Sequence, residues 1–141
     1  MKKLLILLLF IINDIYAYDA YDVYDAIKEV ESGGDCKAIG DNGKAIGAYQ
    51  IHEIYVKDAN RISGKSYTLE DRYDEKKSLE IVKIVTTYYG NYYKKKTGKE
   101  VTPEIIARIH NGGALGWNKS STISYWNKVK SKLIERNTNT K

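Results

Sequence analysis

Residues 31–52, ESGGDCKAIGDNGKAIGAYQIH, constrain the fold more than any other part of the chain. A helical pattern leads into this stretch and is predicted to end at Gly33 and Gly34, because glycine readily adopts the left-handed conformation of a helix terminus. Residues 37–46 then favour two short extended arms. The turn between them is predicted at Asp41-Asn42-Gly43, since Asn and Gly tolerate positive φ. The chain must therefore leave a helix and double back as a small hairpin.

Apolar side chains at helical spacing predict that most of the remaining chain is helical. Asp74 and Thr102 are expected to be N-caps, and Pro103 suits the first position of a helix. Gly98 is expected to end the helix that follows Asp74. The fold class is therefore α+β, predominantly α, with one small β-hairpin. The predicted helices span residues 21–31, about 49–60, 75–97, 103–110 and from about 122, and a polar, disordered tail is expected over residues 137–141.

The first residues of the chain have the pattern of a secretory signal peptide. Lysines precede an apolar run over residues 4–12, and Ala17 offers a small residue at the cleavage position. A membrane anchor is the alternative, but the run is too short to cross about 30 Å of hydrocarbon, and Asn13 and Asp14 interrupt it. We therefore expect residues 1–17 to be a signal peptide and the protein to be periplasmic or secreted, with no stable membrane insertion after cleavage.

Cys36 is the one cysteine among 141 residues, so no internal disulfide can form. The domain expected over residues 18–136 must therefore be stabilised by packing. The sequence contains no phosphate-binding loop, dinucleotide motif or zinc-ligand spacing, so neither a cofactor nor a metal is predicted. The net charge of +5 favours either polyanionic partners or a merely solvated lysine-rich surface. For an exported protein we expect no nucleic acid among those partners.

Glu31 lies in the last turn of the helix predicted over residues 21–31. A carboxylate there faces the negative end of the helix dipole, where a lysine would be the stabilising choice. This position indicates that Glu31 serves something other than stability. The two histidines, His52 and His110, are more simply interpreted as single hydrogen-bonded side chains than as general bases.

Four motifs in order resemble the lysozyme-like superfamily. They are ESG at residues 31–33, G-x-Y-Q-I at 47–51, ARIHNGG at 107–113 and ST-x-x-YW-x-KV at 121–129. The nearest resemblance is to the invertebrate-type lysozymes, and the first two motifs are also similar to the soluble lytic transglycosylases. The resemblance implies a lysozyme-like catalytic domain over residues 18–136 that acts on the glycan strands of peptidoglycan.

The resemblance also implies that Glu31 is the catalytic acid and that the hairpin faces it across a cleft. Cleavage of a glycosidic bond needs a proton for the leaving oxygen and stabilisation of the positive charge on the sugar ring. Asp41, within the pattern of Gly40 to Gly43, is the preferred second carboxylate, and Asp35 is the other candidate. The alternative for Asp41 is an ordinary turn residue whose side chain bonds nearby backbone amides.

The remaining motif residues are candidates for substrate binding. The side-chain amides of Gln50 and Asn111 suit acetamido groups, and glycine lets a sugar approach the backbone because no Cβ intervenes. The alternative for these glycines is only to end the helix. Aromatic rings pack against sugar faces. The candidate substrate-binding residues are Tyr49, Gln50, His110, Asn111, Gly112, Gly113, Trp117 and Tyr125, whereas Trp126 is assigned to the core.

Three functions are consistent with this resemblance. The preferred one is a lysozyme, or muramidase, that cleaves the β-1,4 linkage between N-acetylmuramic acid and N-acetylglucosamine. The first alternative is a lytic transglycosylase that forms 1,6-anhydro ends, and the second is a catalytically silent module that binds wall sugars. A secretion machine or an inhibitor protein is a possible partner. The chain departs from the invertebrate-type lysozymes in one respect, because those proteins are rich in disulfides and this one cannot form any internally.

Overall fold

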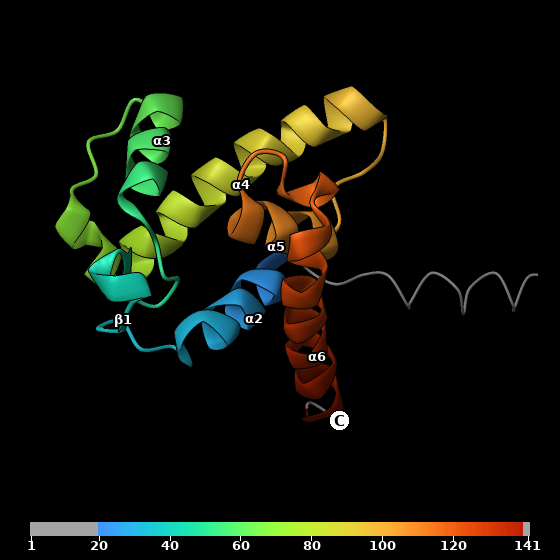
Figure 1. Cartoon of the computed structure of the whole chain (residues 1–141), viewed down its shortest axis with the longest axis horizontal. Helices are drawn as coiled ribbons and strands as arrows, with labels where there is room; N and C mark the ends of the chain where they lie inside the picture. The colour runs from blue at the N-terminus through green and yellow to red at the C-terminus, as the bar shows by residue number, and fades with distance from the viewer. Residues whose placement is uncertain (1–19, 140–141) are drawn as a thin grey trace, which may run out of the picture.

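The computed structural model describes residues 20–139, and within them α4 (Glu75–Thr97) is the longest helix (Figure 1). The side chain of Asp74 caps this helix by accepting a hydrogen bond from the backbone N–H of Lys77. Gly98 ends it in the left-handed conformation, with φ of 71°. Both predicted ends of the helix are therefore confirmed.

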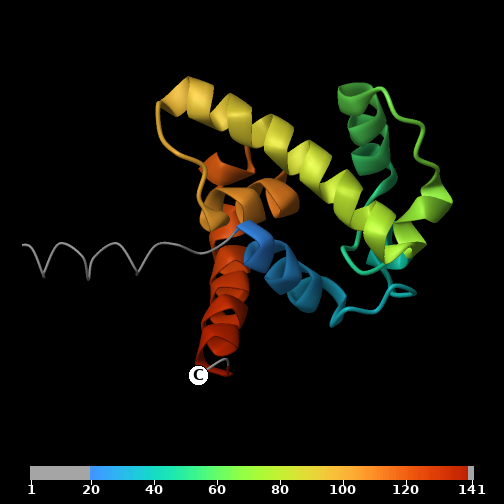
Figure 2. The same cartoon turned by 180° about the vertical axis from the view of Figure 1, so that it is seen from behind.

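Three further helices pack together beside α4 (Figures 1 and 2): α2 (Ala20–Ser32), α5 (Pro103–Gly112) and α6 (Ile123–Asn139). α2 contacts α6, while α5 contacts α2, α4 and α6. As predicted, Thr102 caps α5, where its hydroxyl accepts a hydrogen bond from the backbone N–H of Ile105. The buried faces of the helices share one apolar core, which includes Val23, Ala26, Ile27, Ile81, Val82, Val85, Ile106, Ala107, Val129 and Leu133.

The predicted hairpin is confirmed. It consists of β1 (Ile39–Gly40) and β2 (Ala45–Ile46), an antiparallel pair in which Ile39 is opposite Ile46. A single turn of 3-10 helix, η1 (Asp41–Gly43), joins the strands. The φ angles of Asp41 and Asn42 are 46° and 53°, in the left-handed region that Asn and Asp tolerate better than other side chains.

Hydrogen bonds tie the end of α2 to this hairpin. The hydroxyl of Ser32 donates to the backbone carbonyl of Ala48 at 2.8 Å, and it accepts from the N–H of Gly34 at 3.1 Å. The N–H of Gly47 donates to the carbonyl of Ala38 at 2.8 Å. The chain therefore doubles back directly against the last turn of the helix, as the sequence of this stretch required.

α3 (Glu53–Ser63) begins later than the sequence predicted, which placed the start of a helix near Tyr49. Gln50 has a φ of 49°, which no α-helix accommodates, and Ile46 and Ile51 exchange backbone hydrogen bonds in an antiparallel bridge. Ile51 is fully buried in this turn. In the sequence, the spacing of Ile51 therefore made this buried turn residue look like part of the apolar face of α3.

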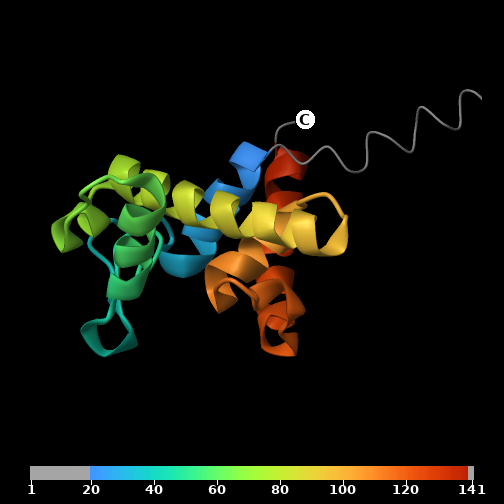
Figure 3. The same cartoon turned by 90° about the horizontal axis from the view of Figure 1, so that it is seen from above.

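The elements form two groups along α4 (Figure 3). The hairpin and α3 lie toward one end of α4, with the short 3-10 turn η2 (Leu69–Tyr73), whereas α5 and α6 lie toward the other. Two more 3-10 turns, η3 (Gly116–Asn118) and η4 (Ser120–Thr122), connect α5 to α6. α2 lies between the groups and reaches the hairpin with its C-terminal end.

At the C-terminal end the structure differs from the sequence prediction, whereas the predicted signal peptide at the N-terminal end cannot be compared with it. α6 extends to Asn139, so residues 137–139 continue the helix where a disordered tail was predicted. Residues 140–141 and the signal peptide predicted over residues 1–17 lie outside the described residues. Among residues 20–139, no helix combines the length and the apolar character needed to span a membrane.

Candidate active site

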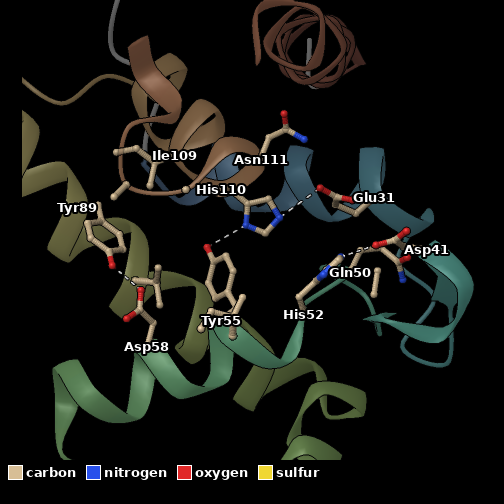
Figure 4. A pocket seen from close by; sticks show the side chains of 15 residues that line it. Glu31, Asp41, Gln50, His52, Tyr55, Asp58, Tyr89, Ile109, His110 and Asn111 are labelled. Carbon is tan, nitrogen blue, oxygen red and sulfur yellow. Dashed lines mark hydrogen bonds and ion pairs between the residues drawn. The ribbon is translucent and has the colours of Figure 1, made fainter. Parts of the chain in front are cut away.

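A cleft of about 580 Å³ separates the two groups of elements (Figure 4). The hairpin and α3 form one wall, and α5 and the loop after it form the other. Between them, α2 contributes one lining residue and α4 contributes two. The lining residues are Glu31, Asp41, Ala45, Gln50, His52, Ile54, Tyr55, Asp58, Val85, Tyr89, Ile109, His110, Asn111, Gly113 and Ala114. The cleft thus brings both predicted catalytic carboxylates into one space.

Glu31 lies in the last turn of α2, and its side chain is 19% exposed. The hydroxyl of Tyr125, from α6, donates a 2.7 Å hydrogen bond to Oε1 of Glu31. Nε2 of His110, from α5, lies 3.3 Å from the same oxygen. Within the described chain, both of these contacts fall on Oε1, so they fix one oxygen and do not involve Oε2.

His110 is itself fixed from the other side. Its side chain is only 4% exposed, and its Nδ1 lies 3.1 Å from the hydroxyl oxygen of Tyr55, which comes from α3. The two rings lie 5.5 Å apart between centroids. A continuous chain of contacts therefore runs from Tyr55 through His110 to Glu31, as Figure 4 shows.

Burial controls the protonation of the two tyrosines in this chain of contacts. Burial raises the pKa of Tyr55 well above its ordinary value, and the charge of Glu31 contributes in the same direction. Burial likewise raises the pKa of Tyr125, again with a contribution from the neighbouring Glu31. Both phenols therefore stay neutral at any ordinary pH, and both keep a proton to donate.

Asp41 lies at the tip of the hairpin on the opposite wall. Its Oδ2 is 3.3 Å from Nε2 of His52, the residue that precedes α3, and both side chains are about half exposed. This contact joins the turn of the hairpin to the start of α3 (Figure 4). Asp35, the other candidate for the second carboxylate, accepts a hydrogen bond from the backbone N–H of Lys37 and is not among the residues that line the cleft.

Four of the predicted substrate-binding residues line the cleft around these carboxylates: His110, described above, and three more. Asn111 is exposed at the end of α5, and Gly113 follows it with a φ of 79°. Gln50 lies beside the hairpin, where its side-chain amide donates to the carbonyls of Gly47 at 2.9 Å and Ala38 at 3.3 Å. The amide nitrogen of Gln50 is therefore used within the hairpin, and the side-chain oxygen, which lies beside Gly40, takes no part in these two bonds.

Four of the predicted substrate-binding side chains occupy other positions. Tyr49 is 1% exposed and belongs to the core, so its ring has no surface to offer a sugar. Gly112 packs against Thr122, and Trp117 packs edge-on against Tyr93, outside the residues that line the cleft. Tyr125 donates a hydrogen bond from its hydroxyl to Glu31 and is not among the residues that line the cleft.

The sequence did not identify three residues that shape the cleft. Tyr55 supports His110, while Asp58 accepts a short hydrogen bond from the hydroxyl of Tyr89 at the far end. The chain contains thirteen tyrosines, and no spacing distinguishes these two from those of the core. Only the packing of α3 against α4 and the contact of Tyr55 with His110 reveal them. No group of three or more possible metal ligands occurs among the described residues.

Comparisons with known proteins identify the family of the chain and its relatives. The family model described as Destabilase matches residues 21–132. The chain is 35% identical to invertebrate-type lysozyme 3 of Caenorhabditis elegans over 126 residues, which cover 82% of this chain and 87% of that protein. Invertebrate-type lysozyme 6 of the same organism is 34% identical over 104 residues, 68% of this chain and 75% of that protein.

The backbone is also similar to that of a solved lysozyme complex. It matches a chain in the crystal structure of Aeromonas hydrophila PliI in complex with Meretrix lusoria lysozyme with a TM-score of 0.66 and 27% identity, over 78% of this chain and 87% of that one. These findings confirm the lysozyme-like fold and the predicted resemblance to the invertebrate-type lysozymes. Because the family match extends over most of the chain, the protein belongs to the Destabilase family.

Proposed function

We propose that this protein is a glycoside hydrolase of the lysozyme type, which cleaves the β-1,4 linkage between N-acetylmuramic acid and N-acetylglucosamine in bacterial peptidoglycan. Its family and its named relatives support this activity. The observation that carries the proposal is the carboxyl group of Glu31. It lines a cleft of about 580 Å³, one of its oxygens is fixed by two neighbours, and Asp41 lines the same cleft.

Glu31 acts as the general acid. Because Oε1 contacts both Tyr125 and His110, the transferable proton belongs on Oε2. Oε2 delivers it to the glycosidic oxygen as the bond between that oxygen and the sugar's anomeric carbon breaks. A positioned acid of this kind contributes roughly 10²- to 10⁴-fold to the rate.

Asp41 acts as the second carboxylate. Its negative charge stabilises the positive charge that develops on the sugar ring, and it is suited to form the covalent intermediate of a retaining enzyme. Water then hydrolyses that intermediate, with Glu31 as the base. The contact of Asp41 with His52 at 3.3 Å supports this role, since it orients a side chain at the tip of the hairpin.

The glycan strand lies along the cleft between the two walls. Asn111 and the backbone at Gly113 contact its acetamido groups from one wall, and the side-chain carbonyl of Gln50 contacts it from the other. Ile54, which is 69% exposed at the rim, packs against a sugar face. The protein meets this substrate after export, which residues 1–17 direct as a signal peptide.

Digestion of purified peptidoglycan sacculi tests the proposal. The wild-type protein is expected to release muropeptides with reducing ends, which mass spectrometry identifies. Glu31→Gln is expected to lower the rate by at least about 10²-fold, and Asp41→Asn to lower it as well. Glu29→Gln is the matched control, because Glu29 is an exposed carboxylate of the same helix that does not line the cleft.

Each alternative function predicts a different result. Anhydro ends with full activity in Asp41→Asn would identify a lytic transglycosylase, in which the sugar's own hydroxyl attacks. Binding to sacculi without any new glycan ends would identify a silent wall-binding module. Normal turnover by the Glu31→Gln variant would contradict the assignment of the acid.

A protein inhibitor is a further partner that we propose. PliI from Aeromonas hydrophila forms a complex with the lysozyme of Meretrix lusoria, whose fold is similar. Here the exposed side chains of Asp41 and Asn111 lie on opposite walls of the cleft, so an inhibitor bound over both would block access to Glu31. Addition of PliI is expected to slow the release of muropeptides, which the same assay measures.

A further inference from the structure

The side chain of His110 is more deeply buried than that of Glu31, at 4% against 19% exposed, and both of its ring nitrogens have a partner. Nδ1 faces the hydroxyl of Tyr55 at 3.1 Å, and Nε2 faces Oε1 of Glu31 at 3.3 Å. With its side chain 4% exposed, the ring has almost no surface and no free nitrogen for a sugar. These observations disagree with a role in binding substrate directly.

The partners of His110 determine where its proton lies. A neutral imidazole has one nitrogen that donates and one that accepts. Oε1 of Glu31 is an acceptor toward Nε2, so Nδ1 of the neutral ring accepts from the hydroxyl of Tyr55, whose proton burial retains. The proton of the neutral ring then lies on Nε2, which donates it to Glu31. The titratable groups that face the ring are Tyr55, Glu31 and Tyr125.

We propose that His110 is a positioning residue: held in the Nε2–H tautomer by Tyr55, it fixes Oε1 of Glu31 and so directs the acid proton to Oε2, the oxygen that faces the substrate. This proposal rests on the proposed role of Glu31 as the acid. It assigns Tyr55 a part in the same arrangement, although Tyr55 has no contact with the carboxyl group itself. His110 contributes orientation to catalysis and transfers no proton to the sugar.

The tautomer is measured without any assay of activity. Nitrogen-15 NMR of the full chain labelled at histidine separates a protonated ring nitrogen from an accepting one, and the chain has only two histidines to assign. A His52→Gln variant identifies the signals of His110. At mildly alkaline pH, where free imidazole is neutral, His110 is expected to be protonated at Nε2. In Tyr55→Phe this preference is expected to weaken.

Kinetics on a soluble peptidoglycan fragment provide the second readout. His110→Leu removes the donor and is expected to lower kcat about 10- to 100-fold, with KM nearly unchanged. His110→Gln places an amide N–H near the position of Nε2 and is expected to restore most of that loss. Tyr55→Phe is expected to lower kcat by a smaller factor. Tyr92→Phe is the control, because this exposed tyrosine of α4 lies outside the cleft.

The outcomes separate this proposal from the proposed function. If the wild-type protein cleaves nothing, the proposed function fails while the tautomer still reports on the arrangement around His110. If the wild type is active but His110 is protonated at Nδ1, the positioning role is wrong. A rise in KM with unchanged kcat would identify a substrate-binding residue instead. If kcat falls equally in the Leu and Gln variants and the ring shows no tautomer preference, the positioning role is wrong and His110 only packs against its neighbours.

Discussion

At the scale of single residues, the position of Glu31 carries an energetic cost that its neighbours offset. The carboxylate lies at the C-terminal end of α2, where the helix dipole disfavours negative charge. Tyr125 and His110 approach its Oε1 from two other helices, at 2.7 and 3.3 Å. Hydrogen-bond donors of this kind stabilise a carboxylate where the helix itself does not. The site thus depends on contacts between residues that lie far apart in the sequence.

The hydroxyl of Tyr125 gives a prediction at this scale. Tyr125→Phe keeps the ring but removes the donor to Glu31, so the carboxyl group loses one of its two fixed contacts. Hydrogen bonds to charged groups are worth about 1.5–3 kcal/mol, so kcat is expected to fall at least about tenfold. The measurement is the rate of muropeptide release. Tyr92→Phe removes an exposed hydroxyl of α4 and should leave the rate as it is; an undiminished rate in Tyr125→Phe would show that His110 alone suffices.

The sequence predicted the residue types of this site better than their roles. Glu31, Asp41, Gln50, Asn111 and Gly113 were named from motifs, and all of them line the cleft. Tyr49 and Tyr125 were both expected to contact sugars, yet one lies in the core and the other donates a hydrogen bond to Glu31. A sequence motif tells which side chain occupies a position. The direction in which it points depends on the packing of whole helices, which no local pattern records.

At the scale of elements, the sequence predicted the ends of helices correctly wherever a capping side chain or a glycine determines them. Asp74, Thr102 and Gly98 mark helix ends in the structure as they did in the sequence. The start of α3 was missed because periodicity alone does not distinguish a buried turn from the first turn of a helix. There, a positive φ at Gln50 and the bridge between Ile46 and Ile51 replace helical geometry.

Gly47 gives a prediction about how the hairpin is attached. Its φ is 80°, and a Cβ added there would lie 2.0 Å from the backbone carbonyl oxygen of Arg72, in η2. Gly47→Ala is therefore strained in two ways, by the left-handed backbone at about 1–2 kcal/mol and by a forced shift of η2 at about 1–3 kcal/mol. The free energy of unfolding, from denaturant titration, is expected to fall by their sum.

The control for this prediction is Gly64→Ala. Gly64 ends α3 with a φ of 70°, and no atom lies within 4 Å of a Cβ added there. This variant isolates the cost of the left-handed backbone, at about 1–2 kcal/mol. If both variants lose the same stability, η2 moves away without cost, and the hairpin is not rigidly held against it.

At the scale of the whole molecule, the fold relies on packing. The single cysteine allows no internal disulfide, so the shared core of α2, α4, α5 and α6 must supply the stability. The sequence predicted this core, because the apolar stripes of the helices are continuous. It could not predict the cleft, which lies between the hairpin and α3 on one side and α5 on the other, and which Tyr55 and Tyr89 help to line.

Three tyrosines with raised pKa values predict that the protein loses stability in alkali. Burial raises the pKa of Tyr24, Tyr55 and Tyr125 in the native state, whereas in the unfolded chain tyrosine ionises near pH 10. Above that pH the unfolded state releases protons that the native state retains, so the free energy of unfolding falls as pH rises. Each such tyrosine contributes a slope of up to about 1.4 kcal/mol per pH unit, until its native pKa is reached.

Tyr24 isolates this effect because it lies in the core and outside the cleft. Its hydroxyl is 2.9 Å from that of Thr86, and Thr86 also donates to the carbonyl of Val82 at 2.8 Å, so Tyr24→Phe leaves no donor stranded on Thr86. Denaturant titrations of this variant above pH 10 are expected to give a shallower loss of stability than the wild type. Tyr92→Phe, at an exposed position, should reproduce the wild-type slope. Identical slopes in all three proteins would mean that exposed lysine pairs, and not buried phenols, set the alkaline limit.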